Sequence, residues 1–208
     1  MSLHVWLTFI VAALLISLSP GPGAISCMAS GLRYGYRRTL ANIAGLQLGV
    51  ALQLLVVGVG LGALLAASTL AFELARGFGV AYLCYLGWQQ FHAEVKPLEI
   101  GYQSRSPSTL RALVMQGFLV NASNPKATIF LLAVLPQFID PHAPALPQYL
   151  ICMATLTVSD LLIMSAYALF AVRVLRLLHE PHHIRWMNRG FGGMYMLAAG
   201  FLALFRRA

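Results

Sequence analysis

Two apolar runs of this chain are each long enough to cross a bilayer, and each is interrupted by residues that break a helix. The first is interrupted at 20–22 by Pro-Gly-Pro, and the fourth at 124–126 by Asn-Pro-Lys. A hydrocarbon core offers no hydrogen-bond partner to backbone groups that proline frees, so such breaks persist only where protein or a water-lined cavity covers them. One broken helix in each half of a chain is typical of a transporter with a site near the middle of the membrane.

The composition excludes an ordinary soluble domain. Apolar residues make up 59% of the 208 residues and charged residues only 10%, whereas about 25% of an average soluble domain is charged. We therefore predict an all-α integral membrane protein with one domain over 1–208. The net charge of +8 comes from short basic clusters between the apolar runs. This distribution favours the positive-inside pattern of membrane proteins over a nucleic-acid partner.

Six apolar runs are predicted to cross the membrane, since about 20 apolar residues suffice for one crossing. The polar stretch 173–189, which carries His179, His182 and His183, is predicted to be a solvated connector rather than a metal site. The sixth run is short, so whether it crosses completely stays open. The six runs cover 5–32, 39–67, 72–91, 110–135, 148–172 and 190–205.

The basic residues predict an orientation. Ten Lys and Arg lie in the connectors after the first, third and fifth runs, and three lie on the opposite side. This bias places those connectors in the cytoplasm and both termini outside. If the sixth run does not cross, the C-terminus moves to the cytoplasm and the counts become twelve and one.

Six crossings divide evenly into two groups of three, which then have opposite orientations. Residues 1–92 form the first three-helix repeat, 93–109 a cytoplasmic loop, and 110–208 the second repeat. The breaks fall in the first and fourth helices, which occupy corresponding places. We therefore predict two inverted three-helix repeats with helices 1 and 4 broken, the arrangement of many secondary transporters.

The first break is a candidate substrate site made of Pro20, Gly21, Pro22 and Gly23. Each proline removes a backbone donor and clashes with the preceding turn. The break would leave a bare helix N-terminus, whose partial positive charge suits a carboxylate. The alternative is a simple kink, because Pro and Gly are common in membrane helices.

The second break supplies Asn121, Asn124 and Pro125 as further candidate substrate-binding residues. Asn121 and Asn124 are three residues apart and share a helix face. Lys126 lies about 15 Å along the helix from Pro136, too far for its ammonium to reach the interface easily. An ammonium in hydrocarbon is costly, so Lys126 must be paired or face water. The alternative is a structural tether for the broken helix.

Asp160 is the only acidic residue well inside an apolar run. Its predicted depth is similar to that of Lys126 on the preceding run, so the two groups could pair. Burial and a neighbouring cation act in opposite directions on a carboxyl group, which suits a proton carrier. We predict that Asp160 carries a coupled proton and that Lys126 tunes it. The alternative is a static buried ion pair.

The second run carries a narrow stripe of small and polar residues at 42, 45, 49 and 53, spaced at helical periodicity. We predict that Gly45 and Gly49 let a neighbouring helix approach closely. Asn42, near the cytoplasmic end of the run, is a candidate for the entrance of the substrate path.

Four motifs together resemble the LysE/RhtB family of bacterial amino-acid exporters. They are Ser-Pro-Gly-Pro-Gly at 19–23, Ala-Asn-Ile-Ala-Gly-Leu-Gln-Leu-Gly at 41–49, Asn-Pro-Lys at 124–126 and Leu-Pro-Gln-Phe at 135–138. The resemblance extends from the first run to the fifth. Family members usually carry Asn after Pro-Gly-Pro, whereas this chain has Gly23. The resemblance implies efflux of small amino acids from an inner membrane, driven by the proton gradient.

We therefore expect a multi-pass inner-membrane exporter of neutral amino acids such as leucine, threonine or homoserine, working by proton antiport. One core carboxylate and one core ammonium can neutralise each other, which leaves no partner for a charged substrate side chain. An exporter of another metabolite or a cation is the alternative, and an intramembrane enzyme or accessory subunit is less favoured. We find no nucleotide-binding or nucleophile motif, and we predict no catalytic residue, cofactor or metal. The expected partners are an amino acid, a proton and membrane lipid, with a homodimer left open.

Overall fold

The computed structural model describes residues 1–67, 69–94, 109–140 and 143–204, and over these ranges the secondary structure is entirely helical. Most of the predicted loop 93–109 lies outside the described residues. The predicted all-α class is confirmed. The helices are α1 Leu3–Leu18, α2 Pro22–Tyr34, α3 Tyr36–Ala67, α4 Thr69–Phe91, α5 Leu110–Ala122, α6 Pro125–Val134, the 3-10 helix η1 Leu135–Phe138, α7 Ala145–Leu169, α8 Ala171–His179 and α9 Pro181–Leu204.

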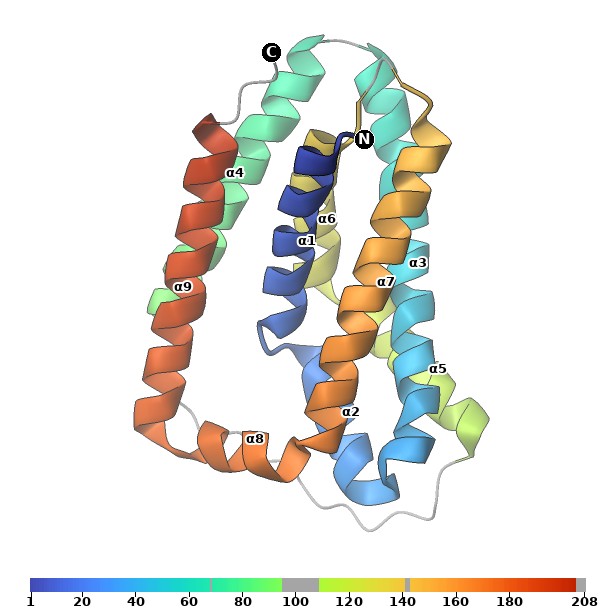
Figure 1. The fold of residues 1–208 in the computed structure, drawn as a ribbon, viewed down its shortest axis with the longest axis vertical. Coiled ribbons are helices and arrows are strands. Elements are labelled where there is room, and N and C mark those ends of the chain that lie inside the picture. Colours follow the sequence, from blue (N-terminus) through green and yellow to red (C-terminus); the bar gives the residue numbers. More distant parts are fainter. Residues whose placement is uncertain (68, 95–108, 141–142, 205–208) are drawn as a thin grey trace.

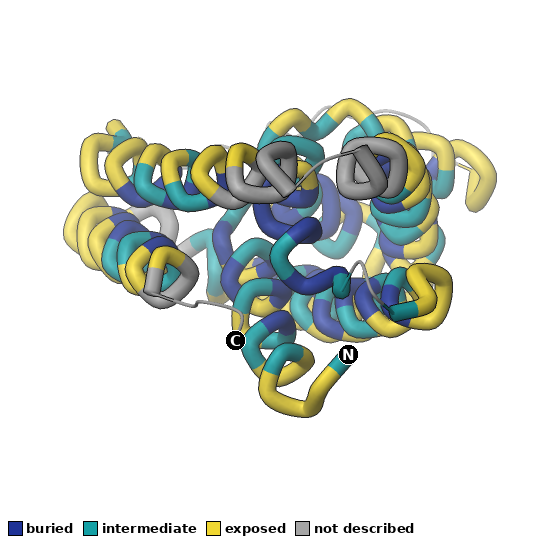
Figure 2. The backbone as a smooth tube through the Cα atoms, turned by 90° about the horizontal axis from the view of Figure 1, so that it is seen from above, coloured by how far each residue is buried: buried dark blue, intermediate teal, exposed yellow. Residues whose placement is uncertain are grey.

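The long helices run roughly along one direction, as Figure 1 shows. Helices α4 and α9 form a pair at one side, α1 and α6 lie in the middle, and α3 and α7 lie at the other side. Helix α8 crosses the lower end, and the N-terminus and the last turn of α9 lie at the upper end. Seen from above in Figure 2, buried residues gather at the centre and exposed residues surround them. That outer surface includes many large apolar side chains, such as Leu197 at 75% and Val59 at 71% exposure, as a lipid-facing surface requires.

Among the described residues, two helices are individually long and apolar enough to cross a membrane, Tyr36–Gly60 within α3 and Ala145–Leu169. Two further pairs meet the same criteria together but are bent, α1 with α2 by 58° and α5 with α6 and η1 by 53°. The number of candidate spans is therefore two, or up to four when each bent pair counts as one. Both predicted breaks are present, at residues 19–21 and 123–124.

Helices α3 and α5 are packed backbone to backbone through glycines. A Cβ atom added to Gly45 would collide with the carbonyl oxygen of Val114, and one added to Gly117 would collide with that of Asn42. A Cβ on Gly49 would come within 2.8 Å of the Asn121 Cβ. The predicted packing role of Gly45 and Gly49 is confirmed. The close approach also brings the second break, just after Asn121, against the middle of α3.

The connector predicted over 173–189 is helical, since α8 and the first turns of α9 occupy it. Helix α9 begins at Pro181, nine residues before the predicted start of the sixth run. Proline is well suited to a first helical position. The charged residues lie on one side of the first turns of α9. On the other side, Ile184 and Asn188, four residues apart, are buried at 6% and 7% exposure. The Gln90 side chain donates a hydrogen bond of 3.0 Å to Asn188 and ties α4 to α9.

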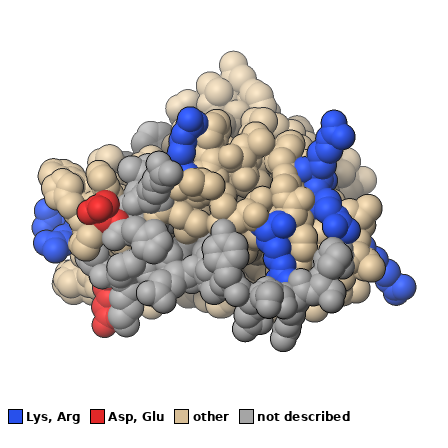
Figure 3. Space-filling model, turned by 90° about the horizontal axis from the view of Figure 1, so that it is seen from below, with Lys and Arg blue, Asp and Glu red and all other residues tan. Residues whose placement is uncertain are grey.

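The lower end of the molecule carries the α2–α3 connection and α8, which belong to the connectors that we predict to be cytoplasmic. Figure 3 views this end and shows Lys and Arg side chains at several separate places rather than in one stripe. No group of three or more His, Cys, Asp and Glu side chains within the described ranges could hold a metal ion. The distribution of positive charge agrees with the predicted orientation, which stays a prediction.

Candidate functional site

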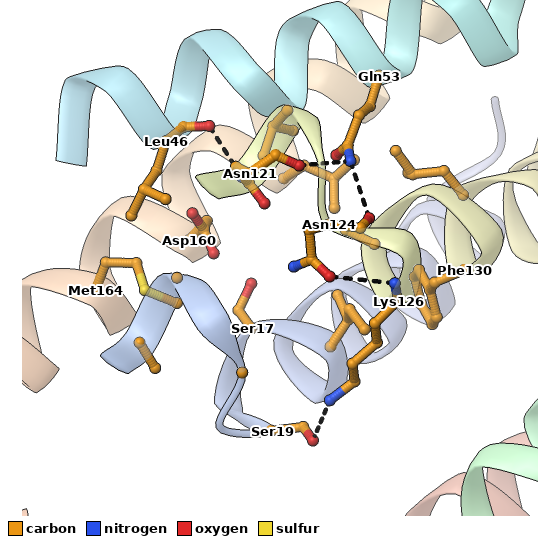
Figure 4. Close-up of a pocket in the computed structure, with 18 residues that line it drawn as sticks. Ser17, Ser19, Leu46, Gln53, Asn121, Asn124, Lys126, Phe130, Asp160 and Met164 are labelled. Atoms are coloured by element: carbon orange, nitrogen blue, oxygen red, sulfur yellow. Dashed lines mark hydrogen bonds between the residues drawn. The ribbon is translucent and has the colours of Figure 1, made fainter. Parts of the chain in front are cut away.

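The two breaks border one pocket with a volume of about 70 Å³ (Figure 4). Six helices, α1, α2, α3, α5, α6 and α7, and both breaks contribute to its walls, so residues far apart in the sequence meet there. Its apolar lining includes Phe130, Leu131 and Leu156. The polar and charged side chains that line it are Ser17, Ser19, Gln53, Asn121, Asn124, Lys126 and Asp160.

At the first break, α1 ends and α2 starts without a side-chain cap. The Tyr167 hydroxyl donates a hydrogen bond of 2.7 Å to the Leu18 carbonyl, which the break would otherwise leave without a partner. Gly21 precedes α2 as its N-cap residue and makes no side-chain cap to the first turn. The first N–H groups of a helix have no intrahelical acceptor and carry partial positive charge. Because Gly23 and Ala24 line the pocket, the predicted bare helix N-terminus borders it.

At the second break, one side chain of α3 binds the freed carbonyls. The Gln53 amide donates to the carbonyl oxygens of Asn121 at 2.7 Å and Asn124 at 3.2 Å, and it lies 2.8 Å from the Thr128 hydroxyl. The Asn124 side chain accepts from the Lys126 backbone at 3.1 Å and so caps α6. The α6 N-terminus is therefore occupied by its own chain, whereas that of α2 is bare.

Gln53 was not among the residues predicted for the site. Its only signal in the sequence was its place on the stripe of α3 that also carries Gly45 and Gly49. Asn121 is one of the residues predicted for the site. Its side chain donates a hydrogen bond of 2.9 Å to the Leu46 carbonyl and is held against the same helix.

Lys126 joins the two breaks. Its ammonium donates a hydrogen bond of 2.6 Å to the Ser19 hydroxyl at the end of α1, and it lies 5.9 Å from the centre of the Tyr195 ring. A cation at this distance from an aromatic face is attracted by the ring. The side chain therefore points into the protein, and its positive charge is presented to the pocket.

Asp160, on α7, accepts a hydrogen bond of 2.7 Å from the Gln47 amide, and Ser17 lies beside it (Figure 4). The ion pair considered between Asp160 and Lys126 is not formed, because the lysine side chain extends to Ser19 instead. Each charged group is bound by neutral side chains, Asp160 by Gln47 and Lys126 by Ser19. The pocket thus has an ammonium and a carboxylate on separate parts of its lining.

Of the other residues predicted for the site, some line the pocket and some do not. Gly21 and Gly23 line the pocket, whereas Pro20, Pro22 and Pro125 shape the helix ends without lining it.

Asn42 lies away from the pocket and is completely buried at 0% exposure. Its amide accepts from Ser26 at 3.2 Å and donates to the Leu113 carbonyl at 3.4 Å. It therefore connects α2, α3 and α5.

Comparison with known proteins identifies the family of this chain. The sequence model of the LysE type translocator family matches residues 14–205. The chain is 40% identical, over all of both sequences, to a homoserine/homoserine lactone efflux protein of Salmonella typhimurium. It is 39% identical to an uncharacterized membrane protein of Vibrio cholerae over 98% of each sequence. A leucine efflux protein of Klebsiella pneumoniae is 28% identical over 66% of this chain and 65% of its own.

No solved structure matches the chain. The resemblance noted from the four motifs is confirmed by a match over nearly the full length, and it identifies a membrane transporter rather than an enzyme. The chain belongs to the LysE type translocator family.

Proposed function

We propose that this protein exports small neutral amino acids across the inner membrane in exchange for protons. The observation that carries the proposal is a single pocket with a positive and a negative side chain that do not pair with each other. A zwitterion needs both charges at separate places. The relatives named for homoserine and leucine efflux support this substrate class, and the higher identity to the former favours homoserine.

In the proposed binding mode, the substrate carboxylate lies between the first turn of α2 and the Lys126 ammonium. Helix N-termini bind anions through free N–H groups and the helix dipole. The substrate ammonium lies against Asp160, and the Asn124 amide nitrogen, which faces the pocket in Figure 4, is a further donor. Both charges of the pocket are then used by the backbone of the amino acid. A charged substrate side chain would have no partner, so neutral amino acids are favoured.

The same carboxylate explains exchange. A proton and a substrate ammonium compete for Asp160, because a neutral carboxyl no longer attracts a cation. On the outer side a proton displaces the amino acid, and on the cytoplasmic side the proton leaves and another amino acid binds. Lys126 takes part in coupling by holding the substrate carboxylate while a proton replaces the substrate ammonium at Asp160. Mutually exclusive binding at one site is sufficient for antiport.

We also propose that α4 and α9 complete six crossings in two inverted three-helix repeats. Both helices extend along the same direction as the candidate spans in Figure 1, and the bent pairs occupy the first and fourth places. The two unwound segments border one pocket, as expected when repeats of opposite orientation build a central site.

The test is transport by the purified protein in liposomes under an imposed pH gradient. We expect homoserine, threonine and leucine to move against the direction of proton flow, and an uncoupler to abolish the movement. Lysine should not be transported, because its side chain would lack a partner. Protein-free liposomes are the control. Transport of none of these amino acids, or transport that ignores the uncoupler, would contradict the proposal.

Gly23 offers a prediction about selectivity. A Cβ atom there would lie 3.5 Å from the Leu46 side chain, an ordinary van der Waals contact. We expect Gly23→Ala to leave the yield of folded protein and export unchanged. Gly23→Asn adds an amide to the pocket lining and should raise export of homoserine relative to leucine, since an apolar substrate side chain leaves a buried amide unpaired.

The measurement is the ratio of the two initial rates in proteoliposomes, with Gly23→Ala as the matched control. An equal ratio in both variants would show that position 23 does not contact the substrate side chain.

A further inference from the structure

A second, larger cavity lies beside the polar pocket. It has a volume of about 570 Å³ and is bordered by α1, α4, α6, η1 and α9, a size in the usual range for sites that bind organic ligands. Nearly all of its lining is apolar. Val134 and Leu83 are buried within it, whereas Leu7, Val11 and Leu197 are at least half exposed at its rim.

The two cavities share one side chain. Phe130, which is 2% exposed, lines both the polar pocket and the apolar cavity. It lies four residues after Lys126 on α6, so the two side chains are on the same face of the helix. Tyr195, on α9, also lines the apolar cavity, and its ring centre lies 5.9 Å from the Lys126 ammonium. The Phe130 ring therefore forms part of the wall between a charged compartment and an apolar one.

We propose that Phe130 determines substrate specificity by closing the polar pocket off from the apolar cavity and so limiting the size of the exported side chain. The inference rests on the proposed function, because it needs the amino-acid backbone to bind in the polar pocket. With the carboxylate and ammonium held at Lys126 and Asp160, the substrate side chain must lie against the apolar lining, to which Phe130 and Leu131 belong. The pocket of about 70 Å³ leaves room for a small group only.

Removing the ring would join the two compartments. A large side chain would then extend into apolar space, where each buried methylene group favours binding. A small polar side chain such as that of homoserine gains nothing from that space. The ratio between large and small substrates should therefore change, whatever happens to the absolute rate.

The experiment compares Phe130→Ala and Phe130→Leu with the matched pair Phe9→Ala and Phe9→Leu. Phe9 is 1% exposed in the same core cluster and packs on Phe138 with ring centres 5.1 Å apart, but it lines neither cavity. The Phe9 variants therefore lose the same volume without joining the compartments. Export of homoserine, leucine, phenylalanine and tryptophan is measured in proteoliposomes and normalised to the amount of inserted protein.

We expect the ratio of tryptophan to homoserine export to rise by about tenfold or more in Phe130→Ala, the scale on which apolar pockets discriminate by size. The rise should be smaller in Phe130→Leu and absent in both Phe9 variants. Where Phe130→Ala does not insert, Phe130→Leu decides the outcome. An unchanged ratio in the Phe130 variants, or an equal change in the Phe9 pair, overturns the inference.

Failure of the inference is distinguishable from failure of the proposed function. If the wild-type protein exports no amino acid, the proposed function is wrong. If it exports neutral amino acids and the Phe130 variants keep its size selectivity, only the role of Phe130 is wrong.

Discussion

Asp160→Asn is expected to remove the response of export to a pH gradient. Asparagine has nearly the shape of aspartate and can still accept the hydrogen bond from Gln47, which is 2.7 Å long in the wild type. It can neither carry a proton nor attract the substrate ammonium through charge. A hydrogen bond to a charged group contributes about 1.5–3 kcal/mol, and about 1.4 kcal/mol corresponds to a tenfold change in affinity. We therefore expect export to fall by about tenfold or more.

The measurement is initial efflux from proteoliposomes at several imposed pH gradients. Glu180→Gln is the control, because Glu180 is exposed at the end of α8 and does not line the pocket. This variant should keep the wild-type dependence on the gradient. A variant at Asp160 that still responds to the gradient as the wild type does would exclude the carboxylate as the proton carrier.

The two breaks were predictable from sequence because their cause is local. Proline removes a donor and clashes with the preceding turn wherever it stands in a helix, and a run of Pro and Gly at 20–23 has few other outcomes. The possible pairing of Lys126 with Asp160 stayed open at the level of sequence because depth in an apolar run says nothing about the direction of a side chain. A lysine side chain is long enough to extend along its helix or across to a neighbour, and here it reaches Ser19.

The neutral polar residues of the site were harder to predict. Gln53 and Gln47 each lie on an apolar helix, and their partners, Asn121, Asn124 and Asp160, are at least 68 residues away in the sequence. A buried amide contributes to the site only when the fold brings freed carbonyls or a carboxylate to it. Such partners are needed because buried polar groups must form hydrogen bonds. Neither the composition of α3 nor its periodicity contains that information.

The close contact of α3 with α5 was predictable in kind but not in partner. The glycines at 45 and 49 indicate that some helix approaches α3 closely. The structure identifies that helix as α5, where a Cβ atom added to Gly117 would collide with the Asn42 carbonyl oxygen. The same contact positions Asn121 and therefore the second break. Packing and function are thus linked through one glycine interface.

Gly117→Ala should cause a large loss of folded protein. The added Cβ would collide with the Asn42 carbonyl oxygen and lie 2.9 Å from the Leu46 nitrogen. Both are backbone atoms of a helix and cannot rotate away, so α3 and α5 would have to separate. Overpacking costs about 1–3 kcal/mol even where side chains can adjust, and here the whole helix contact is affected. Gly45→Ala should behave in the same way, because its Cβ would meet the Val114 carbonyl oxygen.

Gly60→Ala is the matched control for this prediction, since Gly60 is also in α3 and a Cβ there would meet no atom within 4 Å. Yield of monodisperse protein in detergent and the temperature of irreversible aggregation are measured for all three variants. The Gly60 variant should match the wild type, whereas Gly45→Ala and Gly117→Ala should be strongly reduced in both quantities. Whatever inserts of the Gly117 variant should export poorly, because separation of α3 from α5 moves Asn121 and the carbonyls bound by Gln53. Equal stability of the Gly117 and Gly60 variants would mean that α3 and α5 are not in backbone contact, and the position of the second break would then need another cause.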